Sequence, residues 1–333
     1  MRKKPRILVV GSFVMDVIAT TERIPNSGQA VYGKSFHMAP GGKGANQALQ
    51  CALLGADVTM MGCVGDDLFG QKLLETPMAA GVDVSHVLVR HGVSSGVGHI
   101  TLEVTDHTAQ NRIIVIPGAN QTVQLADVAW IKDAIASFDI VLLQLEVPLE
   151  VNRAVAGWAR DAGVPVMLNP APATDLDETL VKLVTYLTPN EQEASVETGL
   201  PLHTDQDGPV LEDLEQIAGE LSRRGAENII ITLGSHGSAM VKGTNGIHRL
   251  PSVYMDHVAD PTGAGDSFVA AFCVGMTVGL TPEQSIAFAS HTAAITVSRM
   301  GAMPSLPTLD EVLMLLRERK YQGFDLALLD PLK

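Results

Sequence analysis

A glycine-rich turn in the last third of the chain leads directly into an apolar, proline-free segment that begins with a carboxylate. Residues 260–268 read DPTGAGDSF, so Gly263, Ala264 and Gly265 precede Asp266 at the start of a predicted buried helix. Small residues let backbone N–H groups approach a ligand closely, and the positive end of a helix dipole attracts an anion. The pattern therefore indicates an anion site with an acid beside it.

The acid itself has two interpretations. Asp266 could act as a general base beside a bound phosphate, taking a proton from a hydroxyl while the N–H groups stabilise the phosphoryl group in transfer. It could equally cap the helix that it begins. This segment alone leaves the two interpretations open.

A second glycine-plus-helix segment, GGKGANQA at residues 41–48, favours the catalytic interpretation. It is neither a Walker A loop nor a GxGxxG turn, and taken alone it could be an ordinary loop-to-helix junction. Two unlike sites, with Lys43 and Asn46 in one and Asp266 in the other, suit an enzyme with two substrates. One site would hold a polyhydroxyl acceptor and the other a phosphate chain.

The elements that must position these residues alternate along the chain. Short apolar runs without polar alternation predict parallel strands covered on both faces, and helical patterns lie between several of them. The strands are expected at residues 7–10, 58–62, 140–145, 165–168, 184–188 and 228–233, and the helices near 43–54, 69–80, 150–162 and 211–224. The predicted fold is a doubly wound, mostly parallel α/β sheet with helices on both faces, as one domain over residues 1–333.

Two stretches interrupt this alternation and predict a small β lid formed by residues of about 14–40 and 95–117. Residues 97–105 alternate apolar and polar side chains, and a polar turn at residues 106–111 leads into a strand at 112–116. The alternative is a surface hairpin that merely extends the main sheet.

Composition restricts the partners and the compartment. The net charge of 23 − 37 = −14 argues against nucleic acid and anionic membranes as partners. Cys51, Cys63 and Cys273 show no C-x-x-C spacing, which favours reduced core residues in a cytoplasmic protein. The basic N-terminus precedes a run that fits a first buried strand better than a signal peptide, and no run reaches about 20 apolar residues.

The ordered motifs resemble those of the ribokinase-like (PfkB-type) carbohydrate kinases. Besides the two glycine segments, the resemblance includes GS…D at 11–16, LQLEVP at 144–148, LNPAPA at 168–173, TPNEQEA at 188–194, TLGSHG at 232–237 and GAMPS at 301–305. It implies an ATP-dependent phosphotransferase acting on the primary O5 hydroxyl of a pentose, with D-ribose the first choice. It further implies ATP, Mg²⁺ and K⁺ as cofactors and a homodimer formed through the lid.

The resemblance also assigns roles to residues. The catalytic base is Asp266, with Gly263, Ala264 and Gly265 as its anion hole, and the sugar is held by Asp16, Gly42, Lys43, Asn46, Glu146 and Asp266. The nucleotide is contacted by Asn190, Thr232, Gly234, Ser235, Gly237, Gly265 and Ser290. Mg²⁺ is organised through water by Asn190 and Glu193, and K⁺ is bound by Asp260, Thr262, Thr296, Arg299, Gly301 and Ser305.

For some of these positions, the residues alone also allow a purely structural role. Asn190 and Glu193 have the spacing of a helix capping box, which is compatible with the metal role. Glu146 could be a solvated acid in a loop.

One departure from the family pattern concerns the acceptor. Ribokinase-like sugar kinases that use ribose carry Asn two residues before the first sugar-binding Asp, where this chain has Val14. A hydroxyl buried there without a partner would cost roughly 1–3 kcal/mol. Family members that prefer 2-deoxyribose also have an apolar residue at this position, so 2-deoxyribose is the alternative acceptor.

Other classes fit less well. An NAD-dependent oxidoreductase would need GxGxxG after the first strand, and a non-catalytic sugar-binding regulator would not need the intact Asp266 and anion hole. A nucleoside kinase remains open, with Phe13, Tyr32 and Phe36 as candidates for stacking on a base.

Overall fold

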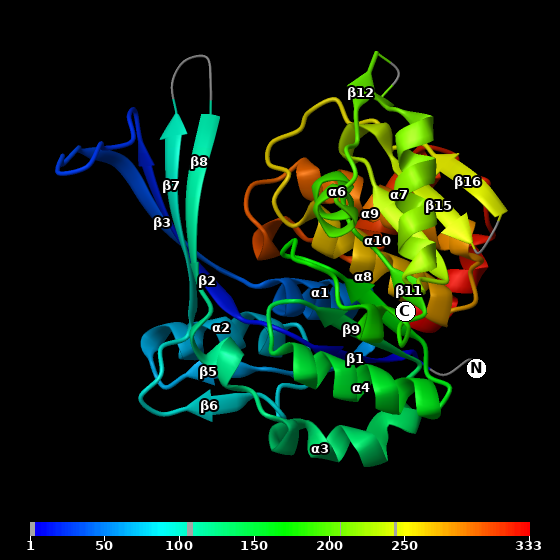
Figure 1. Cartoon of the computed structure of the whole chain (residues 1–333), viewed down its shortest axis with the longest axis horizontal. Coiled ribbons are helices and arrows are strands. Elements are labelled where there is room, and N and C mark those ends of the chain that lie inside the picture. The colour runs from blue at the N-terminus through cyan, green and yellow to red at the C-terminus, as the bar shows by residue number, and fades with distance from the viewer. Residues whose placement is uncertain (1–3, 105–108, 207, 243–244) are drawn as a thin grey trace.

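The protein is built around one eight-stranded sheet. The computed structural model describes residues 4–104, 109–206, 208–242 and 245–333 (Figure 1). The strands of the large sheet are β1 (Arg6–Val10), β4 (Asp57–Met61), β9 (Ile140–Gln144), β10 (Val166–Asn169), β11 (Tyr186–Leu187), β14 (Asn228–Thr232), β15 (Ser238–Lys242) and β16 (Asn245–Leu250). Their order is β16-β15-β14-β11-β10-β9-β1-β4.

Six of these strands are parallel, as predicted, and β15 and β16 add an antiparallel edge that was not predicted. The carboxyl ends of the parallel strands therefore meet at one edge of the sheet, where ligands bind in doubly wound folds.

Helices cover both faces. They are α1 (Lys43–Leu53), α2 (Leu68–Ala79), α3 (Leu125–Ala134), α4 (Leu149–Asp161), α5 (Glu178–Val181), α6 (Glu191–Thr198), α7 (Leu211–Arg223), α8 (Ala264–Thr277), α9 (Pro282–Val297) and α10 (Leu309–Glu318). Along β1, Ile7 and Val9 pack with α1, α8, α9 and α10, whereas Leu8 and Val10 pack with α3, α4 and α7. The alternation explains why the strands are apolar throughout: both faces of the sheet are core. The predicted fold class is confirmed.

A second, four-stranded sheet projects from the body on one side (Figure 1). It consists of β2 (Val14–Thr21), β3 (Gly33–Gly41), β7 (Gly96–Val104) and β8 (Ala109–Ile116), in the order β3-β2-β7-β8. The predicted turn at residues 106–111 is too long, because β8 already pairs with β7 from Ala109 onward. Backbone pairing sets the strand limit regardless of the polar side chains there; residues 105–108 lie outside the described part.

The small sheet is joined to the large one at the site edge. Phe13 connects β1 to β2, and the Asn120 side chain holds its backbone: Oδ1 accepts from Phe13 N–H at 2.9 Å, and Nδ2 donates to the Phe13 carbonyl at 2.8 Å. The same amide donates to the carbonyl of Pro117, which follows β8, at 2.9 Å. Asn120 thus ties the start of β2 to the end of β8 at the base of the small sheet.

The remaining strands form two short pairs, β5 (Cys63–Gly65) with β6 (Leu88–Arg90) and β12 (Thr204–Asp205) with β13 (Gly208–Pro209). None of the helices within the described ranges has the length and apolar character needed to cross a bilayer. Cys51, Cys63 and Cys273 are all buried free thiols.

Candidate active site

Asp266 lies in the first turn of α8 and is only 8% exposed. Its carboxylate does not cap that helix. Oδ2 accepts from Asn46 Nδ2 at 2.8 Å and Oδ1 accepts from Gln47 Nε2 at 3.0 Å, both on α1. The N-cap is Gly263, at φ 80°, and no side chain caps α8. The capping interpretation of Asp266 is therefore wrong, and the acid faces the other glycine-led helix.

The backbone beside Asp266 offers free donors. Within the described ranges, the N–H groups of Gly265 and Asp266 have no hydrogen-bond partner, and a Cβ added to Gly265 would meet no atom within 4 Å. Unpaired N–H groups at a helix N-terminus, with open space beside Gly265, suit an anion. Ala264 differs from the expectation, because its N–H already donates to the Pro261 carbonyl at 3.2 Å.

Asp16 reaches the same region from β2. It fits between the flanking strands because they carry glycine: a Cβ on Gly98 would lie 2.4 Å from Asp16 Oδ1, and one on Gly41 would lie 3.0 Å from Oδ2. Burial, and then the charges of Glu146 and Asp266, raise the pKa of Asp16 to about 6. Three carboxylates thus share one partly dehydrated region.

Lys43 supplies the opposing charge. Burial alone would lower the pKa of its ammonium group, but the carboxylates of Asp266, Glu146 and Glu193 together raise it. The ammonium is therefore held charged amid acids from both predicted substrate sites.

Glu146 is fixed rather than free in a solvated loop. It follows β9, is half-buried, and its Oε2 accepts the Lys43 backbone N–H at 3.0 Å and the Ser12 hydroxyl. Gly42, at φ 97°, leaves no room for a side chain, since a Cβ there would lie 2.7 Å from the Val14 nitrogen. These contacts join the β1 end, the β9 end and the start of α1.

Sequence reasoning missed the amide network behind Asp266. Gln47 Nε2 also contacts Asn169 Oδ1 at 3.2 Å, and Gln47 Oε1 accepts from Gln144 Nε2 at 2.6 Å. Asn169 in turn donates to the Thr188 carbonyl at 2.9 Å. A signal was present, because Gln47 is four residues after Lys43 and so faces the same side of α1. Ser12 and Gly98 were also missed.

The predicted capping box at Asn190 is present. Asn190 Oδ1 accepts from Glu193 N–H and Glu193 Oε2 accepts from Asn190 N–H, both at 2.8 Å. Asn190 also forms a bridge with Thr232 at the end of β14. Burial raises the pKa of Glu193, and Lys43 partly offsets this.

These oxygens are of the kind that Mg²⁺ accepts through its waters. Direct ligation by a cluster of three or more His, Cys, Asp or Glu side chains is not seen anywhere in the described ranges.

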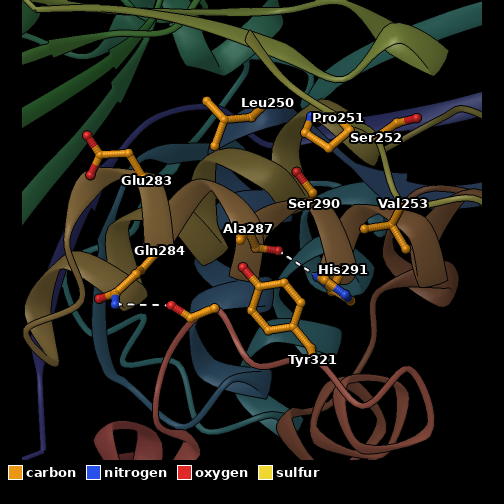
Figure 2. A pocket seen from close by; sticks show the side chains of 11 residues that line it. Leu250, Pro251, Ser252, Val253, Glu283, Gln284, Ala287, Ser290, His291 and Tyr321 are labelled. Atoms are coloured by element: carbon orange, nitrogen blue, oxygen red, sulfur yellow. Dashed lines mark hydrogen bonds between the residues drawn. The ribbon is translucent and has the colours of Figure 1, made fainter. Parts of the chain in front are cut away.

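A cavity of about 360 Å³ adjoins the turn after β14 (Figure 2). Ser290 on α9 lies on one side and Leu250–Val253 on the other. Ser252 Oγ donates to the Ser235 carbonyl at 2.6 Å, and a Cβ on Gly237 would lie 2.0 Å from the Leu250 carbonyl oxygen. Ser290 therefore lines the cavity, and Ser235 and Gly237 contact the segment that forms its other side; Gly234 is in the same turn, at φ 52°.

The predicted K⁺ ligands gather beside the start of α8. Asp260 accepts backbone N–H groups from Thr262 and Gly301, each at 2.9 Å, which holds segments 260–263 and 299–305 together. Thr296 donates its hydroxyl to Ser267 at 3.0 Å and Ser305 donates to the Ala302 carbonyl at 2.7 Å.

The Arg299 side chain turns away from this group and pairs with Glu311. Only its backbone remains as a candidate ligand. One carboxylate with hydroxyl and carbonyl oxygens is a set of oxygen ligands of the kind that hard cations prefer.

The doubly wound sheet and a buried acid beside free helix N–H groups fit a phosphotransferase with an alcohol group as acceptor. Comparison with known proteins makes the class specific. The family profile "pfkB family carbohydrate kinase" matches residues 4–309. The chain belongs to the pfkB family of carbohydrate kinases.

Relatives extend over nearly the whole chain. The ribokinase of Schizosaccharomyces pombe is 38% identical over 314 residues, covering 92% of this chain and 96% of the relative. The deoxyribokinase of Salmonella typhi is 30% identical over 306 residues, with coverages of 92% and 96%. Among solved structures, Arabidopsis thaliana ribokinase complexed with ribose and ATP is 32% identical with a TM-score of 0.85, covering 94% of this chain and 99% of that one.

Proposed function

We propose that this chain is an ATP-dependent kinase that phosphorylates the primary O5 hydroxyl of D-ribose. The observation that carries the proposal is the buried Asp266 carboxylate beside the unpaired N–H groups that begin α8. The similarity to ribokinases, including one complexed with ribose and ATP, supports the choice of substrates.

Asp266 takes the proton of the attacking hydroxyl. A carboxylate has about four acceptor sites, and the amides of Asn46 and Gln47 use two of them, so acceptor capacity remains. Asp16, Glu146, Asn46, Lys43 and Gly42 bind the sugar hydroxyls and hold the reacting oxygen in line.

The backbone N–H groups of Gly263, Ala264 and Gly265 stabilise the transferring phosphoryl group, together with the Lys43 charge. The Ala264 N–H must exchange its contact with Pro261 to take part. Asn190 and Glu193 would hold Mg²⁺ through water, and the ion would supply counter-charge to the phosphate oxygens. K⁺ would be held beside the loop that begins α8 by Asp260, Thr262, Thr296, Arg299, Gly301 and Ser305.

The cavity in Figure 2 receives the base of ATP. Its volume falls in the range of small-molecule sites, Ser290 lines it, and the lining residue Ser252 bonds to Ser235 in the turn after β14. Thr232, Gly234, Ser235 and Gly237 of this turn would contact the nucleotide beside the cavity. Asn190 and Gly265 lie on the phosphate side.

The four-stranded sheet acts as a lid within a single kinase domain, residues 1–333, and its outer face forms a homodimer. Several large apolar side chains of the sheet are solvent-exposed, which favours a protein partner. On the face opposite to Asp16 they are Phe36, Met38, Ile114 and Ile116, whereas Ile113 and Val115 share the face of Asp16. Three buried thiols and the acidic balance suit a cytoplasmic enzyme.

A second acceptor, 2-deoxyribose, is favoured by Val14. This side chain is 7% exposed, and both its Cγ1 and Asp16 Oδ1 border Gly98, so an apolar group lies where the acceptor is bound. For a nucleoside acceptor, Phe13 is fully buried in the core and cannot stack on a base, which leaves the exposed Tyr32 and Phe36 as the aromatic candidates.

The test is ATP-dependent phosphorylation of ribose, 2-deoxyribose, fructose and adenosine. We expect the pentoses to be preferred and Asp266→Asn to lower kcat roughly 10²- to 10⁴-fold. Asp310→Asn, an exposed acid in the first turn of α10, is the matched control. Full turnover by Asp266→Asn would contradict the proposal.

A further inference from the structure

The cavity in Figure 2 has a wall that comes from the C-terminal segment. Tyr321 and Gly323 line it opposite Leu250–Val253, and the Tyr321 side chain points to the middle of the cavity, between Gln284 and His291. Both residues lie beyond residue 309, where the family match ends. This wall is therefore built by a part of the chain that the family profile does not cover.

A strained helix end aims Tyr321 at the cavity. Among the residues described, Lys320 is the only non-glycine residue with a positive φ, 51°. The N–H of Lys320 donates to the Arg317 carbonyl and that of Tyr321 to the Leu316 carbonyl, both at 2.9 Å. This is a Schellman motif with lysine where glycine is usual. Such a conformation costs free energy and persists only where surrounding contacts enforce it.

Further contacts fix the tyrosine ring. Its centroid lies 4.9 Å from that of His291 and 5.5 Å from that of Phe324, both edge-on. A Cβ on Gly323 would lie 2.1 Å from the Tyr321 hydroxyl oxygen, so only glycine fits there without displacing the ring. Gln284 on α9 donates to the Gly323 carbonyl at 3.3 Å.

The rest of the segment is anchored in the core. Phe324, Leu329 and Leu332 are buried, and the Leu332 carbonyl packs against Gly55 at the end of α1. The wall is therefore attached to the core on both sides of the cavity-lining residues, through α10 before them and through Phe324, Leu329 and Leu332 after them.

We propose that the C-terminal segment is part of the nucleotide site and that Tyr321 is a determinant of affinity for the base. The proposal rests on the function proposed above. The cavity offers apolar walls at Leu250, Pro251, Val253 and Ala287, and Tyr321 adds an aromatic ring that a planar purine can contact.

The test is a calorimetric titration of the full chain with MgATP, and separately with inorganic triphosphate, which has no base. Contact between a base and an aromatic ring is worth enough that Tyr321→Ala should weaken MgATP binding roughly 5- to 150-fold. Binding of inorganic triphosphate should be unchanged, and Tyr321→Phe should keep wild-type affinity for MgATP. The exposed Tyr254, which does not line the cavity, provides the control Tyr254→Ala.

Other results overturn the proposal. Unchanged MgATP affinity in folded Tyr321→Ala would do so while leaving the kinase function intact. An equal loss for MgATP and triphosphate would show a general effect rather than recognition of the base. Should Tyr321→Ala not fold, Gly323→Ala, which displaces the ring, must weaken MgATP selectively or the proposal fails. Absence of MgATP binding to the wild-type protein would instead overturn the proposed function, and this inference with it.

Discussion

Gln47 on α1 donates to Asp266 on α8 at 3.0 Å, across 219 residues of sequence. With Asn46 on the other oxygen, it fixes the plane of the carboxylate. Gln47 is itself held by Gln144, at the end of β9. The orientation of the proposed base is therefore determined by a neighbouring helix and by the central sheet.

Gln47→Leu should lower kcat about 10-fold, with little change in KM for the sugar, because one hydrogen bond that orients the base is lost. Steady-state kinetics at saturating ATP measures this, and exposed Gln71→Leu is the control. If Gln47 acts through Asp266, the losses in Gln47→Leu and Asp266→Asn should not add in a double-mutant cycle. Additive losses would show an independent, structural effect.

Asp16 should make sugar capture depend on pH. Its pKa is about 6, so the carboxylate is protonated below that pH and accepts fewer hydrogen bonds from hydroxyls. We expect kcat/KM for the sugar, which reports groups of the free enzyme, to rise as pH increases through about 6. In Asp16→Asn the rise of kcat/KM through about pH 6 should disappear, and kcat/KM should be low at every pH. If kcat/KM of the variant still rose through about pH 6, the titrating group would be another residue.

Val14→Asn should change the choice between pentoses. The introduced amide can hydrogen-bond a hydroxyl that valine leaves without a partner, a difference of roughly 1–3 kcal/mol. The ratio of kcat/KM for ribose over 2-deoxyribose should then rise about 5- to 150-fold. Val89→Asn, at an exposed position on β6 in a different sheet, should leave the ratio unchanged. A ratio unaffected by Val14→Asn would mean that Val14 does not contact the acceptor.

Glu197 should make the protein less stable as pH rises. It is 2% exposed, neither carboxylate oxygen has a hydrogen-bond partner, and burial, followed by the charge of Glu193, raises its pKa to about 9.

The folded state keeps a proton that the unfolded chain releases above its usual pKa of about 4.5. The free energy of unfolding should therefore fall between pH 4.5 and pH 9, by about 3 kcal/mol at pH 7. Urea unfolding at several pH values should show a smaller decline in Glu197→Gln than in the wild type. Exposed Glu215→Gln should behave as wild type. Identical pH dependence in Glu197→Gln and wild type would exclude a buried, protonated Glu197.

Ile114→Lys should separate the proposed dimer. Ile114 is 64% exposed on β8, and a charge in an apolar interface is costly. Size-exclusion chromatography with light scattering should show a monomer for this variant. Glu215→Lys, which changes charge on α7 instead, should leave the assembly intact. If the wild-type protein is itself a monomer, the proposed homodimer is wrong.

Local patterns in the sequence predicted much of this molecule. The strands around β1 are apolar at every position because both faces are buried, and the capping box at Asn190 needs only residues three apart. The partners of Asp266 were less accessible to prediction, since Gln47 meets it only when α1 packs on α8. Tyr321 likewise reaches the cavity through a helix end at an unfavourable φ, which no local preference would indicate.

Asp16 lies on β2, which follows directly after Phe13, the residue that Asn120 ties to the end of β8. The residue that would grip a sugar thus belongs to the element that would enclose it. In such an arrangement, binding of the sugar and closure of the small sheet over it would be coupled. A molecule too small to contact Asp16, such as water, would not favour that closure.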